Sequence, residues 1–222
     1  MADNRSKKVL EVLRKTFAMP KCIASSDPFK TLVVTIISQN TADRNTARAF
    51  ENLSNKFNIT PEALAKANER EIKESLKVAG LYRNKARTIK RISKGILEKY
   101  QGNLKPILSL SIEEAREMLM QFPGVGPKTA DVVLLFCAKQ NTIPVDTHVN
   151  RVSKRLGLAP DNGDYETVRR ALQSIFEPKD YLQVHVLLIL HGRKYCKTRD
   201  PKCKECPINK FCASRHFWDR NG

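Results

Sequence analysis

This chain of 222 residues is short of acidic residues and has no long apolar run. Lys and Arg number 40 against 23 Asp and Glu, which leaves a net charge of +17 and a pI near 9.8. No apolar run approaches the roughly 20 residues needed to span a bilayer, and the opening MADNRSKKVLEVLRK has no signal-peptide core. We therefore expect an intracellular protein of the cytoplasm or nucleoid, with no membrane role. A field of this sign attracts polyanions, and nucleic acid is the most abundant of them.

Hairpin-closing dipeptides are missing where a β-sheet would need them. The runs FKTLVVTIIS, DVVLLFCA and YLQVHVLLIL are β-branched enough to form strands by propensity alone. No Asn-Gly or Asp-Gly dipeptide joins them as a hairpin, and helical signals flank each of them. We therefore predict that all three are buried helices and that the fold is all-α.

Helix-capping signals recur along the chain. Thr60 and Pro61 match an N-cap and first helical residue, and they predict one helix over residues 61–79. Residues 84–100 predict an amphipathic helix with a basic outer face. Its apolar face carries Ala86, Ile89, Ile92, Ile96 and Tyr100. Ser111 with Glu114 matches a capping box, and Asp164 is placed to cap the helix that follows it.

Four of the six cysteines crowd the end of the chain, with spacers of six, two and five residues. They are Cys196, Cys203, Cys206 and Cys212. The surrounding segment is short, basic and interrupted by prolines, so it cannot bury much apolar surface. In a reducing compartment this pattern favours a metal or iron-sulfur centre over disulfides. A four-cysteine zinc site remains an alternative, although only Cys203 and Cys206 form the short pair typical of a zinc knuckle.

The segment QFPGVGPKTADVVLLF, residues 121–136, predicts two helices joined by a tight turn. A capped helix is expected to end at Phe122, Gly124 and Gly126 lie in the turn, and Pro127 occupies the first position of the next helix. Backbone N–H groups at such a turn, followed by a helix N-terminus, form a phosphate-sized anion site that reads no base sequence. This is a helix-hairpin-helix pattern; an ordinary tight turn between two helices is the alternative.

Lys128 lies in the first turn of the helix that leaves this hairpin. The positive end of the helix dipole disfavours a second positive charge there, so partial burial would increase the fraction of neutral, nucleophilic amine. A solvated lysine is the alternative. Eighteen residues later, Asp146 precedes the segment THVNRVSKRL. It is either a structural N-cap or a carboxylate that acts together with Lys128.

Taken together, these segments resemble the endonuclease III branch of the helix-hairpin-helix DNA glycosylases. The resemblance runs from Pro28 to Phe217 and rests on ISQNTAD, GLYRNKA, FPGVGPKTADVV, VDTHVNRV and the cysteine spacing. It implies two helical domains with a DNA-binding cleft between them. Residues 29–140 would form a helical barrel with the helix-hairpin-helix at about 112–137. Residues 1–28 and 141–222 would form a domain whose loop, 196–212, binds a 4Fe-4S cluster through the four cysteines.

The same resemblance implies a monomeric base-excision-repair enzyme that removes oxidised pyrimidines from duplex DNA and then nicks the abasic site. Lys128 matches the family's catalytic lysine and Asp146 its catalytic aspartate. Gln39 and Leu81 match residues that fill the gap left by the flipped nucleotide and wedge the opposite strand. Without the resemblance, Gln39 would be a buried polar group and Leu81 a core residue. Three turn residues are also expected to contact DNA: Gly124, Val125 and Gly126.

Two alternatives stay open from the sequence. A mismatch glycosylase that removes thymine or adenine is one, although such relatives tend to lack a lysine at this place. A structural helix-hairpin-helix iron-sulfur protein that binds DNA without catalysis is the other. The chain also departs from the bacterial pattern: Pro127 stands where a basic residue is common, and Asp131 where asparagine is usual. Because both lie close to Lys128, they put the damage preference in question.

Several further residues have expected roles. Cys22 and Cys137 are expected to be buried thiols outside the metal site. His148, His185 and His191 are expected to have structural roles, the last two within the fold or near the cluster. Four lysines lie among the clustered cysteines and are expected to contact phosphates rather than only solvent. They are Lys197, Lys202, Lys204 and Lys210.

Overall fold

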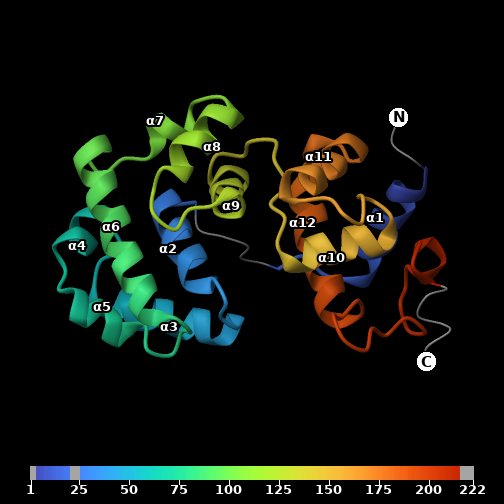
Figure 1. Ribbon diagram of the computed structural model, residues 1–222, viewed down its shortest axis with the longest axis horizontal. Helices are drawn as coiled ribbons and strands as arrows, with labels where there is room; N and C mark the ends of the chain where they lie inside the picture. Colours follow the sequence, from blue (N-terminus) through green and yellow to red (C-terminus); the bar gives the residue numbers. More distant parts are fainter. Residues whose placement is uncertain (1–3, 21–25, 216–222) are drawn as a thin grey trace. The chain divides into compact units, whose positions relative to one another are not determined.

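Helices make up every regular element that the computed structural model describes, which covers residues 4–20 and 26–215 (Figure 1). The predicted all-α fold is therefore confirmed, and the three ambiguous runs are helices. They form α2 (Pro28–Ser38), α9 (Pro127–Cys137) and α12 (Tyr181–Lys194). Within the described residues, no helix has the length and apolar character that crossing a membrane requires. Cys22 lies outside the described residues.

The chain divides into two compact units. The first, called here the hairpin unit, is Ala24–Gln140. The second, the cysteine unit, combines Met1–Ile23 with Asn141–Gly222.

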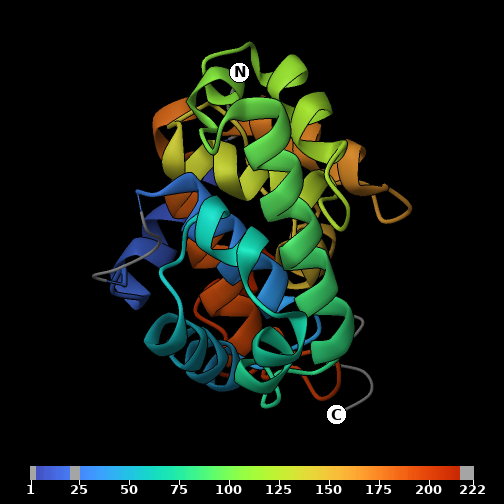
Figure 2. The same ribbon diagram turned by 90° about the vertical axis from the view of Figure 1, so that its left-hand side faces the viewer.

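The hairpin unit is a layered group of helices around one apolar core. Besides α2 and α9 it contains α3 (Asp43–Lys56), α4 (Pro61–Lys66), α5 (Glu69–Ser75), α6 (Tyr82–Tyr100), α7 (Lys105–Leu108) and α8 (Ile112–Met120). The long helix α6 packs on α4 and α5, while α2 packs on α9 and α3 (Figure 2). One cluster of buried side chains runs from Phe29 to Leu134 and includes Ile89, Ile92 and Ile96 of α6. The apolar face predicted for residues 84–100 is thus buried, with Tyr100 partly exposed at its end.

The single helix predicted over residues 61–79 is wrong, because the chain breaks at Ala67 and Asn68. Thr60 caps α4 as expected, its side chain accepting a hydrogen bond from the N–H of Ala63. Ala67 then turns to an extended conformation, and the Asn68 side chain accepts from the N–H of Arg70 to cap α5. Asparagine competes for backbone hydrogen bonds in this way, which favours a cap over a helix interior.

The two helices of the predicted hairpin are α8 and α9. The capping box of Ser111 and Glu114 is confirmed, and Pro127 is the first residue of α9. The prediction that α8 ends at Phe122 is two residues too long, since the helix ends at Met120. The N–H of Phe122 donates to the carbonyl of Leu119 in a tighter turn. This turn directs the ring of Phe122 into the core.

The cysteine unit contains α1 (Asn4–Thr16), α10 (Thr147–Leu156), α11 (Tyr165–Ile175), η1 (Pro178–Asp180), α12 and η2 (Asn209–Phe211). The apolar helix α12 packs against both α10 and α1. Asp146 caps α10 by accepting from the N–H of Val149, and Asp164 caps α11 by accepting from the N–H of Thr167. Each cap therefore fixes where a helix of this unit begins.

Candidate active site and metal centre

The turn between α8 and α9 needs glycine at one position and has open space at the other. Gly124 has φ +76, and a Cβ there would lie 2.7 Å from the Cγ2 of Thr88 on α6. Gly126 has φ −100, and a Cβ there would meet no atom within 4 Å. The packing of the unit therefore explains Gly124. Gly126 instead leaves room beside the turn for an external group to approach the backbone.

The three turn residues expected to contact DNA offer their backbone unequally. Val125 is buried, and its N–H donates to the carbonyl of Phe122 at 3.1 Å. Within the described part of the chain, the N–H groups of Gly124 and Gly126 have no acceptor. With the N-terminus of α9 immediately after them, these two N–H groups are suited to bind an anion.

Gln39 lies at the hairpin turn although 85 residues separate it from Gly124. It is the C-cap residue of α2, and its Nε2 donates a hydrogen bond to the carbonyl of Gly124 at 3.2 Å. Its side chain is thus partly exposed at the turn, not buried within a helix.

Leu81 is exposed and conformationally strained. It directly precedes α6 in the left-handed region at φ 57 and ψ 29, and 60% of its surface is accessible. Exposure to water does not stabilise an apolar side chain. A left-handed conformation also costs about 1–2 kcal/mol for a residue that has a Cβ. Strain of this kind is typical of functional positions. The interpretation of Leu81 as a core residue is therefore wrong.

Lys85 links the start of α6, which follows Leu81, to the end of α2, where Gln39 lies. It is only 4% exposed, and its Nζ donates to the carbonyl of Ile37 at 2.8 Å and to the Oγ1 of Thr41 at 2.5 Å. Burial lowers the pKa of this amine. Sequence reasoning missed this residue, although a signal was present: Lys85 precedes Ile89 by four residues and Ile92 by seven, which places it on the apolar face.

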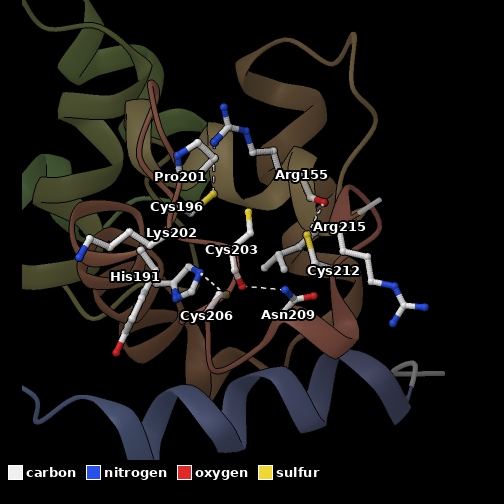
Figure 3. A pocket seen from close by; sticks show the side chains of 12 residues that line it. Arg155, His191, Cys196, Pro201, Lys202, Cys203, Cys206, Asn209, Cys212 and Arg215 are labelled. Carbon is white, nitrogen blue, oxygen red and sulfur yellow. Dashed lines mark hydrogen bonds between the residues drawn. The ribbon is translucent and has the colours of Figure 1, made fainter. Parts of the chain in front are cut away.

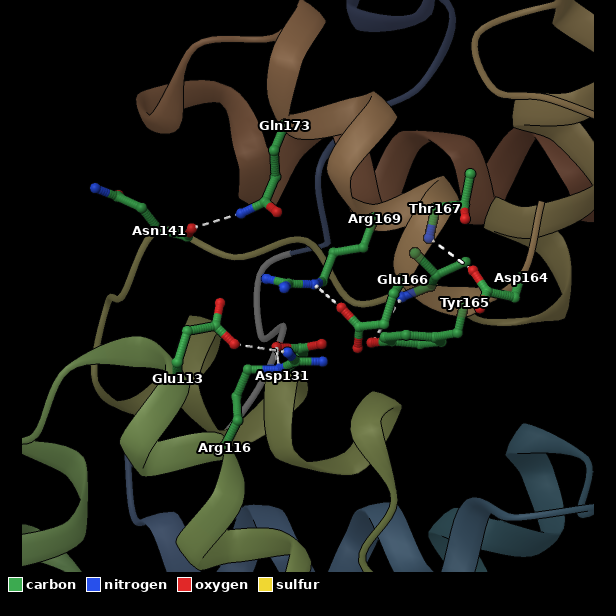
Figure 4. A network of polar contacts seen from close by, with 11 residues as sticks. Glu113, Arg116, Asp131, Asn141, Asp164, Tyr165, Glu166, Thr167, Arg169 and Gln173 are labelled. Carbon is green, nitrogen blue, oxygen red and sulfur yellow. Dashed lines mark hydrogen bonds and ion pairs between the residues drawn. The ribbon is translucent and has the colours of Figure 1, made fainter.

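Lys128 is the second residue of α9 and is partly buried. Three residues further along the same helix, Asp131 is fully buried and forms an ion pair with the Nε of Arg116 on α8 at 3.1 Å. The guanidinium of Arg116 also contacts the carboxylate of Glu113 at 3.1 Å (Figure 4). Asp131 therefore ties together the two helices of the hairpin, close to Lys128.

Asp146 lies in the other unit, where it borders an open pocket. Its Oδ1 accepts from the N–H of Val149 at 2.7 Å, and the side chain stays partly exposed. The pocket is also lined by residues at the start of α11, among them Asp164 and Tyr165. Asp146 is therefore an N-cap with one carboxylate oxygen engaged by the helix. It belongs to the cysteine unit, whereas Lys128 belongs to the hairpin unit.

The four clustered cysteines line one pocket of the cysteine unit (Figure 3). All four are free, which excludes disulfides among them. Burial raises the pKa of Cys206 to about 11 and also raises the pKa of Cys212. Neutral thiols are favoured there unless a cation compensates the charge of the thiolates.

Polar groups from α10 and α12 surround these sulfurs. Arg155 lies 3.6 Å from the Sγ of Cys196, and its carbonyl accepts from the Sγ of Cys212 at 3.3 Å. His191 is buried, with its Nε2 3.7 Å from the Sγ of Cys206. Because burial lowers the pKa of His191 to about 4, the ring is neutral. The expectation that His191 lies near the metal site is consistent with this contact.

The spacing of the donor groups bears on which metal would fit. In the described residues, no three His, Cys, Asp or Glu side chains form a group that could hold a metal ion. A zinc ion gathers its ligands about 2.0–2.3 Å from one centre. A four-iron cluster instead gives each thiolate its own iron, so its sulfurs lie around a larger body. The four thiols that line the pocket belong to a donor type that both kinds of centre use.

The remaining predicted residues occupy varied places. His148 contacts Arg151, and His185 is buried with its Nδ1 2.8 Å from the carbonyl of Pro144. Cys137 is partly buried in the hairpin unit and does not line the cysteine pocket. All four lysines between the cysteines are exposed: Lys197, Lys202, Lys204 and Lys210. Whether these lysines contact DNA stays a prediction.

Comparison with protein families and individual proteins agrees with the resemblance drawn from the sequence. Residues 33–178 match the HhH-GPD superfamily of base excision DNA repair proteins. Endonuclease III of Sulfolobus acidocaldarius is 36% identical over 192 residues, which cover 86% of this chain and 84% of that protein. Endonuclease III of Thermotoga maritima is 35% identical over 203 residues, covering 91% and 89%.

Solved structures give the same result. A trapped covalent intermediate of endonuclease III with DNA, an estranged-adenine complex, matches with a TM-score of 0.85 at 30% identity, covering 99% of this chain and 100% of that one. A thermostable thymine-DNA glycosylase matches with a TM-score of 0.72 and covers 96% and 97%, but at 18% identity it shows the fold alone. The predicted resemblance to endonuclease III is confirmed.

Proposed function

Since this chain belongs to the HhH-GPD superfamily of base excision DNA repair proteins, we propose that it excises oxidised pyrimidines from duplex DNA and nicks the abasic site. It is a DNA glycosylase with abasic-site lyase activity. One observation carries this proposal: Lys128 lies, partly buried, in the first turn of α9, directly after a turn suited to bind phosphate. A mismatch glycosylase that uses only water has no need of a lysine there.

Lys128 supplies the nucleophile. The helix dipole and partial burial favour its neutral amine, which attacks C1′ of the flipped nucleotide. The N–C1′ bond forms as the glycosidic bond breaks, and the damaged base leaves with a proton. The sugar ring opens to a protonated imine, and the positive charge of this imine acidifies the hydrogen on C2′. Loss of that proton and cleavage of the C3′–O bond nick the strand by β-elimination.

Asp146 supports this attack. Its role is either electrostatic stabilisation of the positive charge that develops on the sugar, or transfer of a proton. The N–H of Val149 holds one carboxylate oxygen at 2.7 Å, which fixes the orientation of the side chain.

Gln39, Leu81 and the hairpin turn hold the distorted DNA. Unstacking a nucleotide costs a few kcal/mol, and an inserted amide and an apolar wedge offset part of it. The exposed, strained Leu81 is suited to be the wedge, and Gln39 is suited to fill the gap. The N–H groups of Gly124 and Gly126 are placed to bind a phosphate of the backbone, with Val125 anchoring the turn in the core.

The four cysteines hold a 4Fe-4S cluster. Their common pocket and their spacing of six, two and five residues support this proposal. When bound, the cluster supplies cationic charge and cross-links to a short segment and takes no part in bond breaking. Arg155 and His191 are placed to contact its sulfur ligands. The exposed lysines of this segment contact DNA phosphates.

The two units divide this work. Residues 29–140 form the barrel domain that presents the hairpin, Lys128 and the wedge, and residues 1–28 with 141–222 form the domain that carries the cluster and Asp146. The partner is duplex DNA with a damaged base or an abasic site. The enzyme acts as a monomer, inside the cell, where the DNA is.

Reductive trapping tests the proposal. Wild-type protein mixed with borohydride and duplex DNA that contains one oxidised pyrimidine is expected to become covalently attached to the DNA. Lys128→Ala should lose this adduct by at least about 100-fold, whereas Lys77→Ala, which removes an exposed lysine paired with Glu74, should keep it. Lesion-dependent cleavage without any adduct, or full trapping by Lys128→Ala, contradicts the proposal.

The same assay separates the alternatives when it is run with a panel of duplexes that each carry one lesion. Excision of thymine or adenine from a mispair, with oxidised pyrimidines left intact, identifies a mismatch glycosylase. Binding to abasic DNA without nicking by cluster-loaded protein identifies a structural DNA-binding protein.

A further inference from the structure

Helix α6 concentrates positive charge on a surface to which the proposed reaction assigns no role. Its 19 residues include seven Lys or Arg and a single acidic residue, Glu98, a net charge of +6 out of +17 for the whole chain. Lys85 is buried as described above. Five of the others are exposed, and four of these five are called here the α6 stripe: Arg83, Arg87, Arg91 and Lys94.

The α6 stripe forms a line along one side of the helix. Successive residues of an α-helix turn by about 100° and rise by about 1.5 Å, so these four lie within an arc of about 80° and span about 16 Å. Like charges four residues apart on a helix repel one another and destabilise it. Arg83, Arg87 and Arg91 have this spacing twice in succession.

No carboxylate in the described residues forms an ion pair with the α6 stripe. Arg83 instead lies over the ring of Tyr82, 5.7 Å from its centroid. Arg87 contributes to the low pKa of Glu69, but the hydrogen bond to Lys73 has the larger effect on that group. Nearby lysines of the same unit are compensated. Lys56 pairs with Glu71, Lys73 with Glu69 and Lys77 with Glu74, at 3.2, 2.6 and 2.6 Å.

The segments proposed to contact DNA in this unit gather around the first half of α6. Leu81 directly precedes the helix, and Gly124 of the hairpin turn packs against Thr88. The turn that carries Gln39 is tied to α6 by Lys85. Figure 2 shows α6 lying beside the turn that precedes α9. Arg91 follows Thr88 by three residues and is therefore only about 60° around the helix from the hairpin contact.

We propose that the α6 stripe binds the sugar-phosphate backbone of duplex DNA on one side of the lesion. The inference rests on the proposed function, because that function is what places the wedge and the hairpin against DNA. Phosphates fit the stripe because they carry one negative charge at each step along a strand and read no sequence. About 16 Å corresponds to about five base pairs of duplex. The stripe thus extends the footprint of the hairpin unit along one arm of the DNA.

Salt dependence of binding tests this proposal. The triple variant Arg87→Gln, Arg91→Gln, Lys94→Gln is compared with a control that removes three ion-paired lysines of the same unit: Lys56→Gln, Lys73→Gln, Lys77→Gln. The two variants lose the same charge. Equilibrium binding to a 30-base-pair duplex with a central tetrahydrofuran abasic analogue is measured from low salt to 0.3 M. The plot of log K against log salt has a negative slope, and each lost phosphate contact reduces the magnitude of this slope by about 0.9.

The stripe variant should therefore lose about two to three units of slope and bind about 10- to 100-fold more weakly near physiological salt, whereas the control should lose less than about one unit. Equal losses in both variants would mean that net charge alone matters and would overturn the proposal. An unchanged slope in the stripe variant would overturn it too.

Duplex length gives a second readout. Shortening one arm of the duplex to within about five base pairs of the lesion should weaken binding by the wild type more than by the stripe variant. Urea unfolding controls for folding: since like-charge repulsion is relieved, the midpoint of the stripe variant should be equal or higher. A clearly lower urea midpoint together with an unchanged salt slope would show that the α6 stripe stabilises the fold and does not bind DNA.

Failure of this proposal is distinguishable from failure of the proposed function. Borohydride trapping by the wild type tests the lysine chemistry and does not depend on the stripe. The difference in slope between the two triple variants tests the stripe, and it can be measured even if the wild type forms no covalent adduct.

Discussion

The hairpin unit and the cysteine segment, residues 195–215, are held together in different ways. In the hairpin unit, helices from α2 to α9 share one continuous apolar core. In the cysteine segment, all of whose residues the structure describes, Ile208 is the only buried side chain. Hydrogen bonds from Arg151 and Arg155 to the carbonyls of Cys196 and Lys197 attach the segment to α10.

This difference indicates what each region depends on. An apolar core of this extent positions the hairpin, Lys128 and Leu81 without help from a ligand. A segment with one buried side chain cannot offset the entropy of ordering its backbone, so we expect its fold to depend on the proposed cluster. The same helix, α10, is capped by Asp146 and holds the cysteine segment through Arg151 and Arg155. Loss of the proposed cluster should therefore also disturb Asp146.

The largest expected effect comes from removing one proposed ligand of the cluster. Cys206→Ala should lose most of the iron and acid-labile sulfide per chain and should destabilise the cysteine unit by at least about 4 kcal/mol. Iron and sulfide analysis, visible absorption and urea unfolding measure this. Ile92→Ala, in the core of the hairpin unit, should cost about 2–5 kcal/mol and keep the iron content of the wild type.

Two outcomes would break this comparison. Full iron and sulfide content in Cys206→Ala would show that the four cysteines do not bind one cluster together. Wild-type protein that contains zinc and no sulfide, yet nicks DNA, would overturn the cluster and leave the lysine chemistry intact.

A smaller effect separates the two glycines of the turn. Gly124→Ala places a Cβ 2.7 Å from Thr88 at a positive φ, so it should lower the free energy of unfolding by about 2–4 kcal/mol. Gly126→Ala meets no neighbour and should change that free energy by less than about 0.5 kcal/mol. It should nevertheless weaken binding to abasic-analogue DNA about 10-fold, because the new methyl enters the space proposed for a phosphate. Equal binding by Gly126→Ala and the wild type would contradict that placement.

The smallest effect is a dependence of stability on pH. Burial lowers the pKa of Lys85, so in the pH range between its folded and unfolded pKa the unfolded chain binds more protons. Stability contributed by Lys85 therefore rises as the pH rises through the lowered pKa towards about 10.4. Lys85→Met removes this contribution. Between pH 8 and 10, the urea midpoint of the wild type should rise relative to that of Lys85→Met. If the difference between the two midpoints stays constant over this range, the amine is charged throughout it.

Local chemistry was readable from the sequence, and long-range contacts were not. The caps at Thr60, Asp164 and the Ser111–Glu114 box depend on neighbours within three residues, and the structure confirms them. The break at Asn68 was missed because an asparagine inside a helical pattern either continues the helix or caps a new one, and the pattern does not distinguish these two outcomes. The family resemblance supplied Gln39 and Leu81, whose residue types alone favoured burial.

Other features depend on distant partners. The helical spacing of Lys85 indicates burial, but its hydrogen-bond acceptors, the carbonyl of Ile37, 48 residues earlier, and Thr41, lie far away in the sequence. The ion pair of Asp131 needs Arg116 on the preceding helix, and the contacts of Arg155 with the cysteine segment span more than 40 residues. No periodicity or spacing rule encodes such pairs, because they arise from how the helices pack.

Peptide mapping of the borohydride-reduced adduct is the most direct test of the central claim that Lys128 attacks the sugar. After nuclease and protease digestion of the trapped wild-type complex, mass spectrometry should place the added deoxyribose fragment on the peptide that contains Lys128. An adduct on another lysine or on the N-terminal amine, with Lys128 unmodified, would contradict the account.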